Sequence, residues 1–128
     1  MPYYFSKTTE DDFDTALVKV TEELKHEGFG ILTEIDVQET FRKKLNVNFR
    51  RYKILGACNP DFAYQALIAE DKIGTMLPCN IIVQEHENGK VEVTAVDPVA
   101  SMMAVENSSL AETATEVREK LKNVIDRL

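Results

Sequence analysis

The sequence predicts an α+β fold, a single small domain in which helices pack on a mixed or mainly antiparallel sheet. Two observations support this. Segments with the apolar spacing of helices alternate with short strand-like segments in the order βαβαβαββα. An Asn-Gly pair at 88–89 then joins two strands, which requires at least one antiparallel pair. The length suits one domain over residues 1–128, and no repeat, low-complexity segment or linker divides it.

The first third of the chain predicts a strand, a helix and a second strand. Residues 2–8 are rich in aromatic side chains and predict a strand. Residues 8–28 predict a helix with Thr8 or Thr9 as its N-cap, and residues 29–35 predict the next strand. The apolar stripe of the helix is formed by Phe13, Leu17, Val20 and Leu24.

A second helix and a third strand follow. Asp36 suits an N-cap, and Glu39 three residues later completes a capping box. Residues 49–58 alternate as a strand does, with Arg51 and Lys53 on one face. The opposite face, which we expect to be the core face, carries Tyr52, Ile54 and Cys58.

The stretch GACNPD, residues 56–61, joins this strand to a third helix. Asn59 suits an N-cap and Pro60 suits the first helical position. Residues 60–71 are apolar on several sides, so we expect this helix to be largely buried. Cys58 then fills a small space beneath the helix N-terminus.

Residues 75–98 form the clearest hairpin of the chain. Residues 88–89 are the preferred pair for a two-residue type I′ turn. Such a turn places Asn80 opposite Asp97 at the open end of the hairpin. Residues 99–108 predict a connecting loop.

The chain ends in a long amphipathic helix. Ser109 and Glu112 suit a capping box at its start. Its apolar stripe runs through Leu110, Ala114, Val117, Leu121, Ile125 and Leu128.

Charge and composition restrict the classes of function. The net charge of −7 argues against a general nucleic-acid binder, which needs a positive surface. No apolar run approaches the roughly 18 residues of a membrane span, and the acidic N-terminal segment lacks the features of an export signal. We therefore expect a cytoplasmic protein without nucleic-acid or membrane partners, whose two cysteines, Cys58 and Cys79, are free thiols.

One segment departs from the acidic average. Residues 42–53 carry a charge of +6, so the rest of the chain sums to −13 against a total of −7. Two interpretations are open. The segment is either a solvated surface or an anion site built from Arg50, Arg51 and Lys53.

The sequence contains no familiar catalytic or cofactor motif: GxSxG, GxGxxG, HExxH and the P-loop are absent. His26 and His86 have no sequence partner for acid–base catalysis, and we expect both on the surface. Cys58 is the candidate nucleophile, because a helix N-terminus lowers the pKa of a neighbouring thiol. Asp61 opposes that effect, and a packed, unreactive Cys58 is the alternative. Antiparallel strands would bring Cys79 close to it, and parallel strands would not.

Polar residues at the end of the hairpin are the main candidates for a binding site. Asn80 and Asp97 serve either as hydrogen-bonding residues of strand ends and turns or, with Cys58 and Asn59, as a pocket for a polar ligand or metal. Met102 and Met103 are soft ligands suited to copper, or packing residues. Further candidate ligands are Glu34 and Asp36.

Four stretches cover most of residues 28–103: GFGILTEIDVQETFRKKL, YKILGACNPDFAYQAL, IGTMLPCNIIVQE and VDPVASMM. Together they resemble domain-of-unknown-function family 302 of bacteria and archaea. The resemblance implies a small α+β domain that pairs as a homodimer. It implies no activity and no catalytic residues.

Three hypotheses for the function follow. The first is a non-enzymatic, homodimeric binding or interaction domain with a pocket for a small polar ligand or a metal, near Cys58, Asn59, Asn80 and Asp97. The second is a thiol enzyme or sulfur carrier that uses Cys58. The third is an anion binder that uses residues 42–53. The sequence specifies neither a ligand nor a cofactor.

Overall fold

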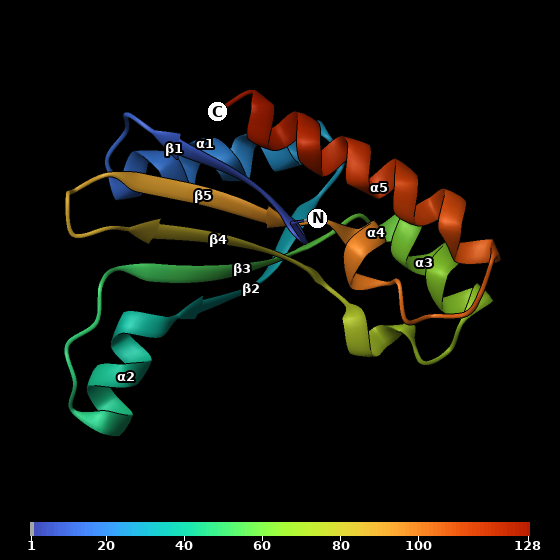
Figure 1. Cartoon of the computed structure of the whole chain (residues 1–128), viewed down its shortest axis with the longest axis horizontal. Coiled ribbons are helices and arrows are strands. Elements are labelled where there is room, and N and C mark those ends of the chain that lie inside the picture. The colour runs from blue at the N-terminus through green and yellow to red at the C-terminus, as the bar shows by residue number, and fades with distance from the viewer. Residues whose placement is uncertain (1) are drawn as a thin grey trace.

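The computed structural model describes residues 2–128, which form five strands, five α-helices and one 3₁₀ turn (Figure 1). None of these helices is both long and apolar enough to cross a membrane. In chain order the elements are β1 (Tyr4–Thr9), α1 (Phe13–His26), β2 (Gly30–Asp36), α2 (Val37–Leu45), β3 (Tyr52–Cys58), α3 (Pro60–Ala69), η1 (Ile73–Met76), β4 (Cys79–Glu85), β5 (Val91–Val96), α4 (Pro98–Ser101) and α5 (Ser109–Asp126).

The strands form one sheet in the order β1-β5-β4-β3-β2, and all neighbouring pairs are antiparallel. The predicted α+β class is therefore confirmed. Helices α1 and α5 pack against one face of the sheet, and α2 lies at its β2–β3 end (Figure 1). At the opposite end α3, η1 and α4 gather beside the first half of α5 (Figure 1).

The main core lies between the sheet and the pair α1 and α5. Every second residue of β3, β4 and β5 is buried there against apolar side chains of both helices. The largest of these buried side chains are Leu55, Ile81, Val83, Val91 and Val93 from the sheet, and Phe13, Val20, Leu24, Leu121 and Val124 from the helices. A smaller cluster of Ala66, Ile73 and Leu110 holds α3 and η1 against α5.

The core face of β3 is the one opposite to the prediction. Leu55 and Ala57 are each 1% exposed and point into the core. Tyr52 and Ile54 are half-buried on the other face, and Cys58 is half-buried at the end of the strand. The alternation was predicted correctly, but both faces of this strand carry apolar residues, so the pattern did not determine which face is covered.

The β4–β5 hairpin has a three-residue loop, which corrects the predicted two-residue turn. The His86 N–H donates to the Lys90 carbonyl at 2.8 Å, and the Gly89 N–H donates to the His86 carbonyl at 2.9 Å. Gly89 has φ +82°, whereas the residue before it is not in the left-handed region that a type I′ turn requires. The register shifts by one residue, and Asn80 therefore does not lie opposite Asp97.

The predicted cap of α2 is confirmed, and that of α1 is corrected. The Asp36 Oδ1 atom accepts the Glu39 N–H at 2.9 Å. Helix α1 is capped by Asp12, whose carboxylate accepts a backbone N–H three residues on at 2.8 Å, instead of by Thr8 or Thr9. The reason is that β1 continues to residue 9, so the helix begins later than the sequence pattern suggested.

The sequence predicted that helix α3 is largely buried, and the structure corrects this prediction. Its one buried residue is Ala66, while Tyr64 and Ile68 are 70% and 73% exposed. The helix lies beyond the end of the sheet and packs on α5 and η1, so only part of its circumference is covered (Figure 1). The predicted loop at 99–108 also differs, because its first residues belong to α4.

Candidate functional site

A cavity of about 270 Å³ lies where α3, α4 and α5 meet the adjoining ends of β3 and β4. Its wall is almost wholly apolar. Besides two cysteines, the polar side chains in the wall are those of Asn59 and Thr113. Much of the remaining wall is formed by Phe29, Phe62, Ala66, Leu67, Leu110, Ala114 and Val117.

Gly56 on β3 allows β2 and the start of β4 to lie close to it beside this cavity. A Cβ atom at this position would lie 2.2 Å from Thr33 Oγ1 on β2 and 2.7 Å from Pro78 Cγ just before β4. Both distances are far shorter than a van der Waals contact, so only glycine allows this packing. Because Leu77 and Pro78 line the cavity, the absence of a side chain at residue 56 helps to set the position of the wall.

Cys58 and Cys79 both line the cavity, from neighbouring antiparallel strands. Cys79 pairs with Ala57, the residue that precedes Cys58. Burial, together with the nearby Cys58, raises the pKa of the Cys79 thiol from 9.0 to about 11, so this thiol is protonated at neutral pH. Cys58 is half-buried, and both residues are free cysteines.

Asn59 occupies the N-cap position of α3 but does not cap the helix with its side chain. Its Nδ2 atom donates instead to the carbonyl of Glu27 at 3.3 Å. The contact ties the segment after α1 to the start of α3, which corrects the capping role predicted for Asn59. The first amides of α3 consequently have no side-chain partner, and Pro60 supplies no N–H of its own.

Asp97 is 4% exposed and is fully engaged in structural contacts. Its Oδ1 atom accepts the Val99 N–H at 3.0 Å, which caps α4. Its Oδ2 atom accepts a bond from Arg118 Nε at 3.2 Å, which joins α4 to α5. The carboxylate therefore fixes the relative positions of two helices that contribute to the cavity wall.

The structure separates the four predicted ligand-binding residues into two groups. Cys58 and Asn59 line the cavity. Asn80 is exposed and pairs with Gly56 across β4 and β3, and Asp97 is used by the helices. A polar ligand held by all four residues together is therefore not what this arrangement favours.

The three basic candidates do not converge on one point. Each has a separate acceptor, and two of the three acceptors are carboxylates. The pairs are Arg50 with Gln84 at 2.9 Å, Arg51 with Asp14 at 2.9 Å and Lys53 with Glu34 at 2.6 Å. Glu34 is thus paired, and Asp36 caps α2, so neither carboxylate belongs to the cavity.

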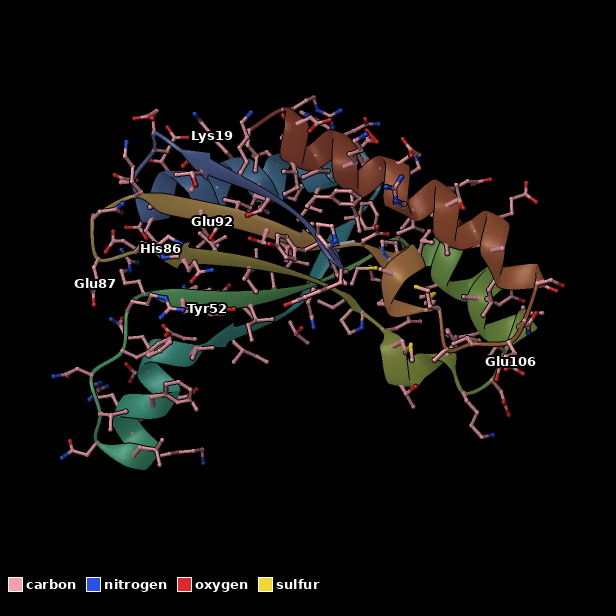
Figure 2. The ribbon with its side chains drawn as sticks, in the orientation of Figure 1. Lys19, Tyr52, His86, Glu87, Glu92 and Glu106 are labelled. Atoms are coloured by element: carbon pink, nitrogen blue, oxygen red, sulfur yellow. The ribbon has the colours of Figure 1, made fainter. Side chains whose placement is uncertain are left out.

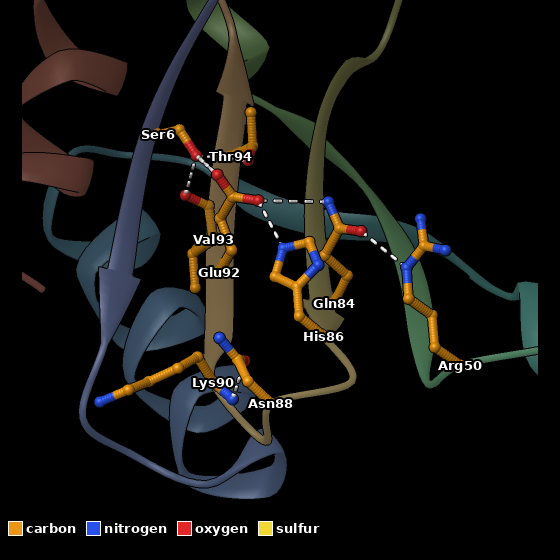
Figure 3. Close-up of polar contacts among 9 residues, drawn as sticks. All are labelled: Ser6, Arg50, Gln84, His86, Asn88, Lys90, Glu92, Val93 and Thr94. Carbon is orange, nitrogen blue, oxygen red and sulfur yellow. Dashed lines mark hydrogen bonds and ion pairs between the residues drawn. The ribbon is translucent and has the colours of Figure 1, made fainter.

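The uncovered face of the sheet carries a connected row of polar side chains (Figure 3). Ser6 Oγ donates to Glu92 Oε2 at 2.6 Å, and His86 Nε2 lies 2.9 Å from Glu92 Oε1. The bonds from Ser6 and then from His86 hold the pKa of the Glu92 carboxyl below its usual value. Gln84 links this group to Arg50, with Nε2 at 3.5 Å from Glu92 and Oε1 bound to the guanidinium.

This row is not a serine–histidine nucleophile pair. Ser6 and His86 both direct their polar atoms to the carboxylate of Glu92, whereas catalysis by a triad needs the histidine to bind the serine hydroxyl. Figure 2 shows His86 and Glu92 on the open face, beside Tyr52. The other histidine, His26, is exposed at the end of α1, 3.7 Å from Glu23.

Within residues 2–128, no three His, Cys, Asp or Glu side chains gather as a metal site. The two methionines considered as soft ligands are separated. Met102 lines the cavity, whereas the side chain of Met103 is 80% exposed.

A family model described as "Domain of unknown function DUF302" matches residues 5–128. The chain belongs to the DUF302 family. Its fold is similar to that of an uncharacterised conserved DUF302 protein from Bacillus stearothermophilus, with a TM-score of 0.91 and 26% sequence identity. The match covers 99% of this chain and 98% of that one. No curated protein sequence matches the chain.

The apolar cavity is the part of this DUF302 domain that sequence reasoning missed. The signal was present in α3, whose apolar residues are spread around the helix and are in part small, such as Ala63 and Ala66. A helix of this kind either is buried on all sides or leaves part of its apolar surface uncovered by other side chains. The second outcome applies here, because α3 lies beyond the sheet.

Proposed function

We propose that this DUF302 protein is a non-enzymatic, homodimeric binding domain whose cavity between α3, α4 and α5 holds a small apolar ligand. The observation that carries the proposal is the cavity itself, about 270 Å³ in volume and walled by apolar side chains. Ligand pockets are typically concave and mainly apolar, with a few polar groups that fix orientation. Asn59 and Thr113 are the residues suited to that second role.

The size and polarity of the cavity define the ligand. An apolar protein cavity of about 150 Å³ stays dry and binds benzene. The present cavity is larger, which favours an uncharged molecule of about two rings or an equivalent aliphatic chain. A charged ligand would lose its hydration without gaining a partner, since no Asp, Glu, Lys, Arg or His lines the wall.

The binding proposal is tested with an uncharged fluorescent probe of two rings, 1-naphthylamine. We expect saturable binding of one probe per chain. Ala63→Leu adds side-chain volume to the cavity wall and should weaken binding by about tenfold, because filled space excludes the probe. Ala111→Leu adds the same volume to an exposed position of α5 and should leave the affinity unchanged. Equal binding by all three proteins would remove the proposal.

The uncovered sheet face supports the homodimer. It extends from Tyr4 on β1 to Ile35 on β2, which are 41% and 49% exposed, across half-buried Tyr52, Ile54 and Ile82. Apolar side chains bordered by polar residues on an open sheet face are a common protein–protein contact, and a two-fold dimer pairs such a face with itself. Light scattering at micromolar concentration should give twice the chain mass. Ile35→Glu should give the monomer mass, and Leu45→Glu, on exposed α2, should leave the dimer intact.

Thiol chemistry at Cys58 is the second candidate function. It is favoured by three observations: Cys58 lines the cavity, is half-buried and precedes a helix start without a side-chain cap. Alkylation of the native protein between pH 5 and pH 9 separates the two functions. A Cys58 that reacts quickly near neutral pH supports the thiol function, and a slow reaction supports the binding domain. Two free thiols also fit the proposed cytoplasmic location, since such compartments keep cysteines reduced.

A further inference from the structure

Three sulfur-bearing side chains line the cavity, and they come from three different elements. Cys58 ends β3, Cys79 begins β4, and Met102 follows α4. All three line the same cavity although they are distant in the sequence. No Asp, Glu or His lines the same cavity. The side chains with metal-binding ability in this wall are therefore soft sulfur donors, apart from the weak oxygen donors Asn59 and Thr113.

The two thiols belong to neighbouring strands. Cys79 pairs with Ala57, so Cys58 is one residue out of register with it. Burial is the main cause of the raised pKa of the Cys79 thiol, and the nearby Cys58 adds a smaller contribution. Neither thiol is used in a disulfide.

Sulfur ligands in an apolar setting select soft metal ions. Thiolate and thioether groups prefer Cu(I), whereas Mg²⁺ and Ca²⁺ require oxygen ligands. Structural zinc sites use four ligands of the Cys, His or carboxylate type, and this wall offers two. We propose that this DUF302 domain binds one Cu(I) ion through the thiolates of Cys58 and Cys79, with the Met102 thioether as a weaker ligand.

The proposed binding is a ligation without redox change. Each thiol releases one proton to solvent and forms one Cu–S bond, so Cu(I) with two thiolates carries a net charge of −1. The start of α3 compensates for this charge, because it directly follows Cys58 and has no side-chain cap. The positive end of the helix dipole stabilises a nearby anion. Asp61 in the first turn opposes this effect, but it is exposed to solvent.

The inference goes beyond the proposed function, because it concerns the cavity wall and does not require an organic ligand. The test is a Cu(I) titration of the reduced full-length protein under anaerobic conditions, in competition with bathocuproine disulfonate. Native mass spectrometry then counts the metal ions per chain. The variants are Cys58→Ser, Cys79→Ser and Met102→Leu. Met103→Leu is the matched control, because Met103 is adjacent to Met102 but 80% exposed.

We expect one Cu(I) per chain and a rise in melting temperature that grows with Cu(I) concentration. Loss of either cysteine should weaken binding by at least about tenfold, since loss of even an outer-shell partner costs that much. Met102→Leu should have a smaller effect, and Met103→Leu should have none. If Cys79→Ser does not fold, Cys58→Ser decides alone. Zn²⁺ should not raise the melting temperature.

Three results would overturn the inference: wild-type protein that cannot compete with the chelator, unchanged affinity in Cys58→Ser, or equal stabilisation by Zn²⁺. The naphthylamine probe shows whether only the copper site has been refuted or the apolar binding function as well. If the probe binds the wild-type protein and Cu(I) does not, the apolar binding domain stands and the copper site is refuted. If Cu(I) binds and the probe does not, the reverse holds.

Discussion

Cys79 lies directly opposite Ala57 across β3 and β4, and this pairing places its thiol in the wall of the cavity. The position explains why the thiol resists ionisation. Burial in apolar surroundings disfavours the thiolate, and the neighbouring Cys58 adds to that effect.

This pairing predicts that stability declines in alkali. The pKa of Cys79 is about 11 in the folded chain against 9.0 for an exposed thiol, so folding disfavours the thiolate. The stabilising contribution is complete below pH 9 and is lost as pH rises through 11, a change of about 2–3 kcal/mol. Urea denaturation at pH 7, 9 and 10.5 should show this decline in the wild-type protein. Cys79→Ala should show a weaker decline, and parallel curves for the two would contradict the assignment.

A second prediction concerns Asp97. Asp97→Ala removes both the cap of α4 and the partner of Arg118, and should cost about 2–4 kcal/mol of unfolding free energy. Glu119→Ala is the matched control. Glu119 also pairs with Arg118, at 3.1 Å, but its side chain is 56% exposed, so its loss should cost less than about 1 kcal/mol. Similar losses in the two variants would mean that Asp97 is not the structural anchor described here.

A third prediction concerns Gly56. Gly56→Ala places a Cβ against Thr33 Oγ1 and Pro78 and should destabilise the protein by about 1–3 kcal/mol. Thr33→Ala in the same chain should restore part of the loss, because it removes the nearer atom. Gly74→Ala is a suitable control, since the nearest atom to its Cβ would be a Leu67 methyl carbon at 4.0 Å. A Gly56→Ala protein with wild-type stability would show that β2 and β4 can move apart at no cost.

The predicted elements were largely correct because their signals are local. The cap at Asp36 and the apolar stripe through Val117 and Leu121 each depend on residues within a few positions of one another. The antiparallel hairpin also followed from the Asn-Gly pair. The register, however, differs by one residue, because Gly89 supports a three-residue loop as readily as a two-residue turn.

The candidate site was predicted less well, because its features depend on contacts distant in sequence. Asp97 was considered a possible ligand, but its partner Arg118 lies on another helix. The capping role of Asn59 was lost to the carbonyl of Glu27, a contact that no local pattern indicates. The cavity depends on which side of α3 faces α5, and an apolar helix without a polar side does not encode that choice.

The hairpin provides a fourth prediction. Gly89 has φ +82°, where a β-branched side chain clashes with its own backbone, so Gly89→Val should cost about 1 kcal/mol or more. Thermal denaturation measures the effect. Glu87→Ala, at an exposed position of the same loop, should change the melting temperature little. An unchanged melting temperature in Gly89→Val would show that the loop has another conformation.

The last prediction uses Glu92 on the open face. Hydrogen bonds from Ser6 and His86 lower its pKa, so the folded state favours the ionised carboxylate. The contribution is present above the ordinary pKa of a glutamate and is lost as pH falls through the lowered value of the folded state. Glu92→Gln cannot ionise, and its stability should therefore fall less steeply than that of the wild-type protein between about pH 5 and pH 3. Glu87→Gln, an exposed residue on the same hairpin, should follow the wild-type curve. If Glu92→Gln also follows the wild-type curve, the hydrogen bonds from Ser6 and His86 do not stabilise the ionised Glu92 carboxylate when the protein is in solution.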